Sequence, residues 1–173
     1  VQVLSPMHRT PCGVDNLNRL LQAALNPPAP EKAEFRGNTL VLRVGDKVMQ
    51  TKNDYTKGVF NGDIGFIREV SADGVKVRYS EELTADYEPN ELMMLTLAYA
   101  MSVHKSQGSE YPVIVLPLVA AHHIMLQRNL LYTAVTRAKK KVVLLGSKAA
   151  VFTAVSNDRT RRRYTLLAER LAG

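Results

Sequence analysis

Apolar residues change their spacing along the chain, and each spacing predicts a different kind of structure. Residues 1–6 predict a short strand that a proline ends. Residues 15–25 predict a helix with Asp15 as its N-cap, because leucines at positions 17, 20, 21 and 25 form one apolar stripe. The prolines at positions 27, 28 and 30 cannot continue that helix, so this stretch predicts a linker.

Residues of about 38–95 show the pattern of short strands instead. Four β-type runs cover residues 40–44, 47–51, 65–70 and 75–79, and turn sequences lie at Asn61-Gly62-Asp63 and Asp73-Gly74. So many short strands with so little helical pattern predict a small β unit, either an SH3-like or an OB-like barrel.

Beyond residue 96 the pattern is again that of alternating helices and strands. Apolar runs at 112–116 and 142–146 predict buried strands of a parallel sheet. The helices that we expect cover residues 97–107, 125–139, 147–155 with Ser147 as N-cap, and 160–171. The predicted fold class is therefore α/β, with a domain of residues 1–37 and 96–173 interrupted by a β insert of residues 38–95.

Composition narrows the class of protein. The 173 residues are 46% hydrophobic, and no apolar run approaches the roughly 18 residues of a membrane span. The single Cys12 excludes an internal disulfide and fits a reducing compartment, so we expect a cytoplasmic protein. The adjacent His122 and His123 are not spaced for one metal ion, and we expect no metal site. The absence of a starting Met suggests a piece of a longer protein.

Positive charge is concentrated in the last part of the chain. Residues 90–173 hold twelve basic and four acidic side chains, whereas residues 37–89 hold seven and nine. Such asymmetry indicates a polyanionic partner, either nucleic acid or nucleotide phosphate. A solvated basic surface is an equally good explanation of the charge taken alone.

Two polar segments near the predicted sheet could carry chemistry. In residues 102–111, Ser102, His104 and Lys105 can donate to phosphates, Gly108 allows close backbone approach, and Glu110 can accept from a ribose hydroxyl. The alternative without a function is a helix end whose polar side chains are solvated. In residues 128–141, Arg137 offers a planar, permanent charge that suits a phosphoryl group undergoing transfer. The bland alternative there is a basic surface helix.

Together the two segments resemble the RecD-like branch of superfamily 1 DNA helicases, which includes the alpha subunit of exodeoxyribonuclease V and the RecD/TraA helicases. Residues 102–111 resemble helicase motif V, and residues 131–138 (Leu-Tyr-Thr-Ala-Val-Thr-Arg-Ala) resemble motif VI. Residues 3–9, with Gly13 and Asn16, resemble the start of the second motor domain, around motif IV. Residues 45–50 and 59–65 resemble the SH3-like subdomain of these enzymes.

The resemblance implies two RecA-like domains, with ATP in the cleft between them and single-stranded DNA across their top. This chain would be the second domain, carrying an inserted SH3-like barrel. Arg137 would then reach the γ-phosphate, Gly108 and Glu110 would lie near the phosphates and ribose, and Arg9 would be a second phosphate contact. Ser102, His104 and Lys105 would face the DNA backbone, and Lys52 and Asn53 of the insert would help to guide the strand.

A phosphate-binding P-loop is missing from the sequence. No G-x-x-x-x-G-K-[ST] occurs in the 173 residues, nor any Gly-Lys pair, so ATP and Mg²⁺ would be held mainly by the first motor domain. The function that we expect is the second motor domain of an ATP-dependent DNA helicase acting in repair or recombination, with 5′ to 3′ polarity implied by kinship. Its partners would be single-stranded DNA, the first motor domain and RecBC-like subunits. The alternative is a non-catalytic nucleic-acid-binding module.

Overall fold

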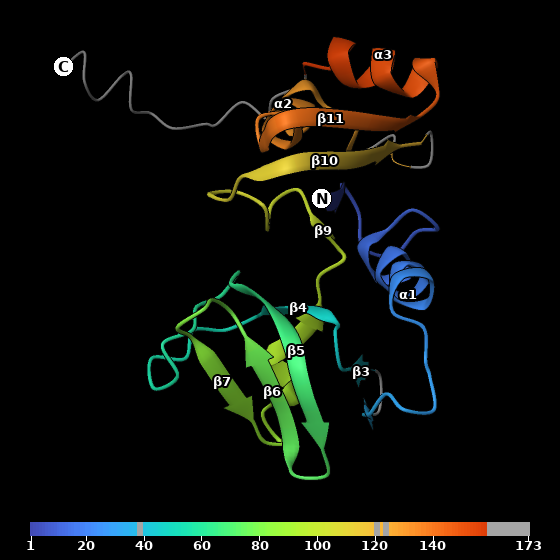
Figure 1. The fold of residues 1–173 in the computed structure, drawn as a ribbon. Helices are drawn as coiled ribbons and strands as arrows, with labels where there is room; N and C mark the ends of the chain where they lie inside the picture. The colour runs from blue at the N-terminus through green and yellow to red at the C-terminus, as the bar shows by residue number, and fades with distance from the viewer. Residues whose placement is uncertain (38–39, 120–121, 123–124, 159–173) are drawn as a thin grey trace, which may run out of the picture.

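The computed structural model describes residues 1–37, 40–119, 122 and 125–158. Its upper part in Figure 1 is a parallel sheet with the strand order β11-β10-β1-β9. Helices α2 and α3 pack together over β10 and β11, while α1 lies beside β9. These elements are β1 (Gln2–Ser5), α1 (Val14–Leu25), β9 (Ala100–Ser102), β10 (Tyr111–Leu118), α2 (Arg128–Val135), β11 (Ala138–Gly146) and α3 (Lys148–Ser156).

A separate antiparallel sheet forms the lower part of Figure 1, with the strand order β7-β6-β5-β4-β8. A two-stranded hairpin, β2-β3, stands beside it, and a short 3-10 helix at Leu92–Met94 precedes β8. The strands are β2 (Glu34–Arg36), β3 (Val41–Arg43), β4 (Lys47–Gln50), β5 (Ile64–Ser71), β6 (Gly74–Arg78), β7 (Thr84–Tyr87) and β8 (Leu95–Leu97). None of these strands joins the parallel sheet, which confirms the predicted fold class of an α/β body with an inserted β unit.

The predicted limits of the insert, residues 38 and 95, divide the β2-β3 hairpin at one end and fall at strand β8 at the other. β2 lies before residue 38 and pairs with β3, and β8 continues to Leu97 while pairing with β4. The domain division itself stays a prediction. Among the described residues, no helix has both the length and the apolar character needed to cross a bilayer.

The predicted helix over residues 97–107 is wrong. Residues 100–102 are instead strand β9, which pairs in parallel with β1 in the register Val3 to Ala100 and Ser5 to Ser102. Residues 103–108 then form consecutive turns. The backbone groups of this stretch are used by the sheet and its turns, so a helical hydrogen-bond ladder cannot form.

The predicted helix over 125–139 is too long. Helix α2 ends at Val135, and the edge strand β11 begins at Ala138, so the three lysines at 139–141 lie on a strand. Ser147 is confirmed as the N-cap of α3, because its side chain accepts a hydrogen bond from the Ala150 amide at 3.1 Å. The predicted helix at 160–171 lies outside the described residues.

Helix α1 buries a polar stripe instead of the predicted leucine stripe. Its N-cap is Gly13, not Asp15. Only glycine fits at this position, because a Cβ there would lie 2.2 Å from the His8 carbonyl oxygen. Leu25 is 68% exposed, whereas Asn18 and Gln22 are buried. Asn18 donates to the Ala100 carbonyl at 2.9 Å and accepts from the Ala100 amide at 2.8 Å. This pair of bonds covers the edge of the parallel sheet at β9.

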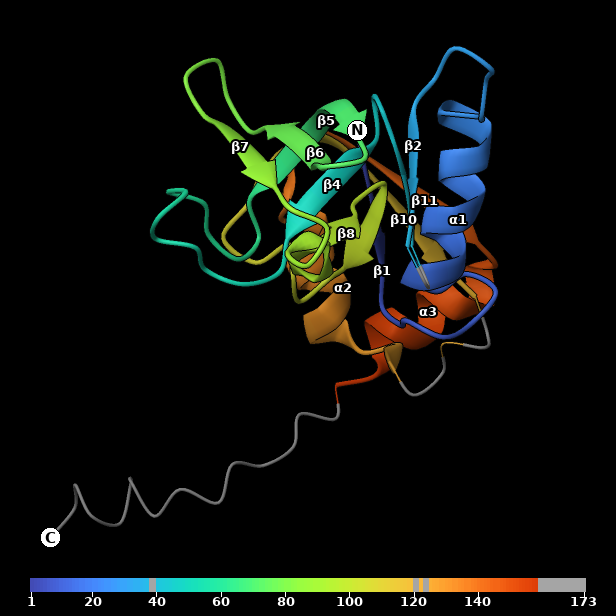
Figure 2. The ribbon, with the colours of Figure 1, turned by 90° about the horizontal axis from the view of Figure 1, so that it is seen from below.

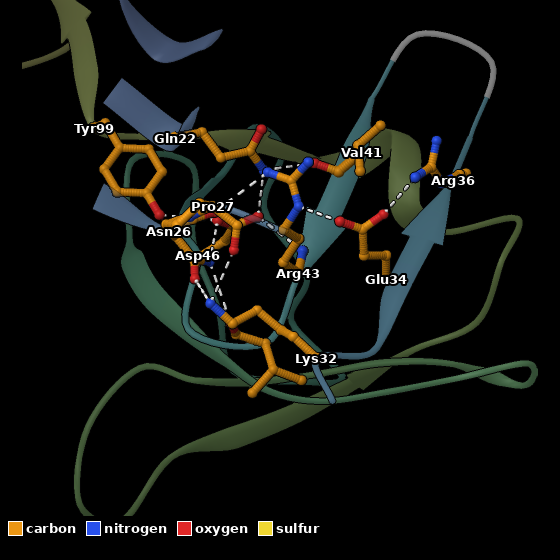
Figure 3. A network of polar contacts seen from close by, with 11 residues as sticks. Gln22, Asn26, Pro27, Lys32, Glu34, Arg36, Val41, Arg43, Asp46 and Tyr99 are labelled. Atoms are coloured by element: carbon orange, nitrogen blue, oxygen red, sulfur yellow. Dashed lines mark hydrogen bonds and ion pairs between the residues drawn. The ribbon is translucent and has the colours of Figure 1, made fainter. Parts of the chain in front are cut away.

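The carboxylate of Asp46, in the turn between β3 and β4, joins α1 to the insert (Figure 3). Asp46 is fully buried and accepts from the side-chain amides of Gln22 and Asn26, each at 2.6 Å. It also accepts from the Arg43 amide at 2.8 Å and from the Tyr99 hydroxyl at 2.9 Å. Burial, and then the bond to Asp46, raise the pKa of Tyr99, so Tyr99 remains a neutral donor. The network therefore connects a helix, a turn of the insert and the segment that returns from it.

Further contacts hold the insert on the body. The buried Gln2 of β1 accepts from Lys47 Nζ at 2.6 Å and donates to the Ala98 carbonyl at 3.1 Å. Met49 of β4 packs in the apolar core of the body, with Leu4 and Met101, although its strand belongs to the insert. The two parts of the chain thus share both a polar network and a hydrophobic contact.

Replacing the central acceptor should destabilise the whole chain. In Asp46→Ala, the buried side-chain amides of Gln22 and Asn26 each lose one of their two acceptors, and each unpaired buried N–H costs about 1–3 kcal/mol. We expect the free energy of unfolding, measured by urea denaturation followed by circular dichroism, to fall by at least about 3 kcal/mol. The matched control is Asp73→Ala in the exposed β5–β6 turn, which should change it by less than about 0.5 kcal/mol. Equal effects of the two variants would contradict this account.

A second prediction concerns His122, which is fully buried after β10. Burial disfavours the imidazolium and lowers the pKa of His122 below its usual 6.5. Below that pH the unfolded chain binds a proton that the folded chain does not, so the free energy of unfolding should decrease by up to about 1.4 kcal/mol per pH unit. Urea titrations between pH of about 6.5 and 5 should show a shallower slope for His122→Leu. A slope equal to that of the unchanged chain would refute the assignment.

Candidate functional site

The segment from Ser102 to Glu110 runs from the end of β9 to the start of β10 as a series of turns. The Ser102 hydroxyl accepts from the Lys105 amide at 3.2 Å, and the Ser106 hydroxyl donates to the Val103 carbonyl at 2.7 Å. We call these residues, 102–110, the turn run. Both serines are buried, so their hydroxyl groups fix the shape of the turn run from within.

One end of the turn run contacts the insert. Lys105 donates from Nζ to Asn61 Oδ1 at 2.7 Å, across 44 positions of sequence. Asn61 belongs to the loop between β4 and β5, residues 51–63, which we call the insert loop. Within that loop Asn53 Oδ1 accepts from the Asn61 amide at 2.9 Å. The structure thus brings together Lys105 and Asn53, two of the predicted DNA-binding residues, through an asparagine that sequence reasoning missed.

The other end of the turn run contacts Arg137, which follows α2. The guanidinium donates to the carbonyl oxygens of Ser109 at 3.4 Å and Thr133 at 3.3 Å, and to the Thr136 hydroxyl at 3.3 Å. Its own carbonyl accepts from the Tyr111 amide at 2.8 Å. All the side-chain acceptors are neutral and the bonds are long, and no carboxylate in the described part of the chain pairs with Arg137. Within the described residues, the guanidinium therefore forms no ion pair.

Glu110 and Gly108 lie at this same end. Glu110 forms an ion pair with Lys139 of β11 at 3.2 Å, and both side chains are more than half exposed. Gly108 has a φ of +84°, and no atom lies within 4 Å of the position that a Cβ would take. The positive φ therefore favours glycine at position 108, and the space beside its Cα is open.

The remaining predicted residues differ in their surroundings. His104, Lys52 and Arg9 are exposed, and Arg9 stands in the turns before α1. Ser102, by contrast, is buried and shapes the turn run, and its direct contact with DNA stays a prediction. A hollow of about 150 Å³ separates the turn run from α2 and is lined in part by His104 and Thr133.

A groove of about 850 Å³ lies elsewhere. Arg19, Phe35 and Met93 line it, between α1, the β2-β3 hairpin and the residues before β8. None of the predicted site residues borders it. This groove therefore does not coincide with the predicted site residues, several of which lie in the turn run or beside it.

Two known families match parts of this chain. Residues 17–86 match the family described as ATP-dependent RecD-like DNA helicase SH3 domain, and residues 97–145 match the UvrD-like helicase C-terminal domain. The chain corresponds to the C-terminal region of RecD-like DNA helicases. The two matches divide between the insert with α1 and the second part of the parallel sheet.

Two relatives of this family are close in sequence. The chain is 41% identical to the ATP-dependent RecD2 DNA helicase of Deinococcus radiodurans, over 96% of this chain and 23% of that protein. It is 34% identical to the RecBCD enzyme subunit RecD of Mycolicibacterium smegmatis, over 98% of this chain and 29% of that protein. The chain thus spans about a quarter of the length of these curated relatives.

Solved structures show the same fold. Pif1 of Bacteroides, in its complex with single-stranded DNA, matches with a TM-score of 0.65 and 22% identity over 99% of this chain and 45% of that one. Pif1 of Candida albicans matches with a TM-score of 0.60 and 20% identity over 91% of this chain and 48% of that one. At such identities these matches establish the architecture alone.

Proposed function

We propose that the chain is the second motor domain of an ATP-dependent DNA helicase, which supplies an arginine finger to ATP and grips single-stranded DNA during translocation. The turn run carries this proposal, because one of its ends contacts the insert loop through Lys105 and the other contacts Arg137. A rigid segment that touches both candidate sites can couple a change at one to a change at the other.

Arg137 has the properties of an arginine finger. It follows a helix and is held by its backbone bond to Tyr111, while its charge is unpaired by any carboxylate described in the structure. A planar guanidinium in that state can bind two phosphate oxygens and stabilise charge that develops during phosphoryl transfer. Exchanging its weak neutral acceptors for a phosphate would strengthen every bond that it makes.

The residues of the chain fit one side of a nucleotide site. Gly108 offers open backbone for phosphate approach, Glu110 can accept from a ribose hydroxyl after leaving Lys139, and Arg9 is a candidate second phosphate contact. ATP supplies the phosphoryl group, with Mg²⁺ neutralising its charge, and both would be held mainly by a first motor domain because this sequence has no P-loop.

The DNA side would use His104 and Lys105 for the phosphate backbone, with Lys52 and Asn53 from the insert loop. Support comes from the fold match to Bacteroides Pif1, which was solved with single-stranded DNA and also in complex with ADP-AlF4. The relative in Deinococcus radiodurans is named as ATP-dependent, and the mycobacterial one as a subunit of RecBCD. We extend these properties to this chain as proposals: 5′ to 3′ movement, a role in repair or recombination in the cytoplasm, and RecBC-like partners.

A non-catalytic nucleic-acid-binding module is the second candidate. The observation that favours it is the exposed edge strand β11, where Lys139, Lys140 and Lys141 follow one another. Such a strand can attract DNA phosphates without ATP. Under this alternative, Arg137 would be a further backbone clamp.

The chain by itself should not hydrolyse ATP. Since it has no P-loop, we expect no DNA-stimulated phosphate release from the purified 173 residues, together with weak binding of oligo(dT) that is lost as salt rises. A phosphate-release assay and fluorescence anisotropy at several salt concentrations measure these quantities. Steady hydrolysis that persists through further purification would contradict the proposal.

Arg137 should matter for chemistry more than for DNA binding. In the intact protein, Arg137→Ala should lower kcat for ATP by about 10³-fold or more, with little change in affinity for oligo(dT). Arg137→Lys should restore little, because a point charge on a flexible stem does not reproduce the planar fork. Steady-state ATPase assays at saturating DNA and anisotropy titrations provide the two readouts.

The control for this prediction is Lys105→Ala, at the other end of the turn run. It should weaken DNA binding and leave the kcat at saturating DNA much less affected. If Arg137→Ala hydrolyses ATP normally but loses DNA, Arg137 is a backbone clamp and its assignment as the arginine finger is wrong.

A further inference from the structure

Two aromatic side chains of the insert loop are exposed next to each other. Tyr55 is 80% exposed and Phe60 is 46% exposed. Their ring centroids lie 5.9 Å apart with an angle of 78° between the planes, so the edge of one ring meets the face of the other. An exposed pair of large aromatic side chains on a polar loop offers flat surface that neither core of the chain uses.

The loop that carries the pair is internally fixed. The backbones of Asp54 and Val59 exchange two hydrogen bonds, of 2.7 and 3.0 Å, and the Val59 side chain is fully buried. The Asp54 carboxylate accepts from the amides of Thr56 and Lys57, each at 3.0 Å, and the Asp63 carboxylate accepts from the Phe60 amide at 2.8 Å. The rings are therefore presented by an ordered loop, which lowers the entropy lost when a ligand stacks on them.

The charge of this loop is balanced, which limits how it can hold nucleic acid. Residues 51–63 contain two lysines and two aspartates, so their formal net charge is zero. Attraction of DNA phosphates is consequently weak here, whereas aromatic rings bind the faces of unpaired bases of any sequence. The loop is better suited to bases than to the backbone.

The insert loop lies beside the residues that are proposed to contact the DNA backbone. Asn61, the residue after Phe60, accepts from Lys105 of the turn run at 2.7 Å. In Figures 1 and 2 the insert loop, drawn in teal, projects from the antiparallel sheet on the side away from α3. A strand whose backbone lies along His104 and Lys105 would reach the loop within a few nucleotides.

We propose that Tyr55 and Phe60 form a stacking platform for the bases of single-stranded DNA, beside the backbone contacts of the turn run. This inference rests on the proposed function, because it requires that the strand follow His104 and Lys105. The platform would bind unpaired bases without sequence preference and would exclude a duplex, whose base faces are already stacked.

The test compares oligo(dT) with an oligonucleotide of the same length whose bases are replaced by abasic sites, using the intact protein. The double variant Tyr55→Ala with Phe60→Ala should bind oligo(dT) about tenfold more weakly or worse, with an unchanged salt slope. It should bind the abasic strand as tightly as the unchanged protein does. Tyr55→Phe keeps the ring and should behave as the unchanged protein.

Two control variants distinguish a failure of the stacking platform from a failure of the proposed function. Phe152→Ala removes an exposed aromatic ring of α3, on the other side of the molecule, and should change nothing. Lys105→Ala should weaken both oligonucleotides and reduce the salt slope by about one. If Lys105→Ala has this effect but the double variant binds oligo(dT) normally, the platform is refuted and the proposed function stands. If the unchanged protein does not bind oligo(dT), or if Lys105→Ala leaves its binding intact, both are refuted.

Discussion

The buried carboxylate of Asp46 holds the two parts of the chain in a fixed relation. Four donors from α1, the insert and the segment leading to β9 converge on it. Without it, the side-chain amides of Gln22 and Asn26 would each keep only a backbone carbonyl as acceptor, and Arg43 and Tyr99 would also lose an acceptor. A carboxylate fully removed from water is stable only with such partners. Because its donors come from elements far apart in sequence, the network fixes where the insert stands on the parallel sheet. The contact between Lys105 and Asn61 depends on that placement.

Under the proposed function, the turn run would couple Arg137 to the DNA contacts. Ser102 and Ser106 are buried and hydrogen-bonded within it, so the turn run cannot change shape at these residues without breaking internal bonds. The insert loop lies at one end of the turn run, and at the other end lies Arg137, which forms no ion pair with any residue that the structure describes. A change of charge at a bound nucleotide would act first on Arg137, and through it on Ser109, whose carbonyl oxygen Arg137 contacts. The resulting shift would pass through a few residues to Lys105 and the DNA strand, as a motor requires.

Much of the fold could be predicted from the sequence, because strands β10 and β11 and the short strands of the insert have strong apolar patterns. The helix over 97–107 was wrong because its residues pair with β1, a long-range interaction that local spacing does not reveal. For α1 the leucine stripe was misleading. Asn18, Gln22 and Asn26, each four residues apart, were the available signal for a buried amide face. In the site, Arg137 and Lys105 were singled out by their chemistry and received their roles from the family resemblance, whereas Asn61, Tyr55 and Phe60 acquire meaning only from the contact across 44 positions.

The central claim is that the insert loop and the turn run form one surface for single-stranded DNA. Amide hydrogen exchange of the intact protein, with and without saturating oligo(dT), tests it most directly. The account predicts that exchange slows together in residues 51–63 and 103–107, while β11 keeps its rate. Slower exchange confined to residues 138–146 would contradict the account, because it would place the DNA on the lysine-rich edge strand.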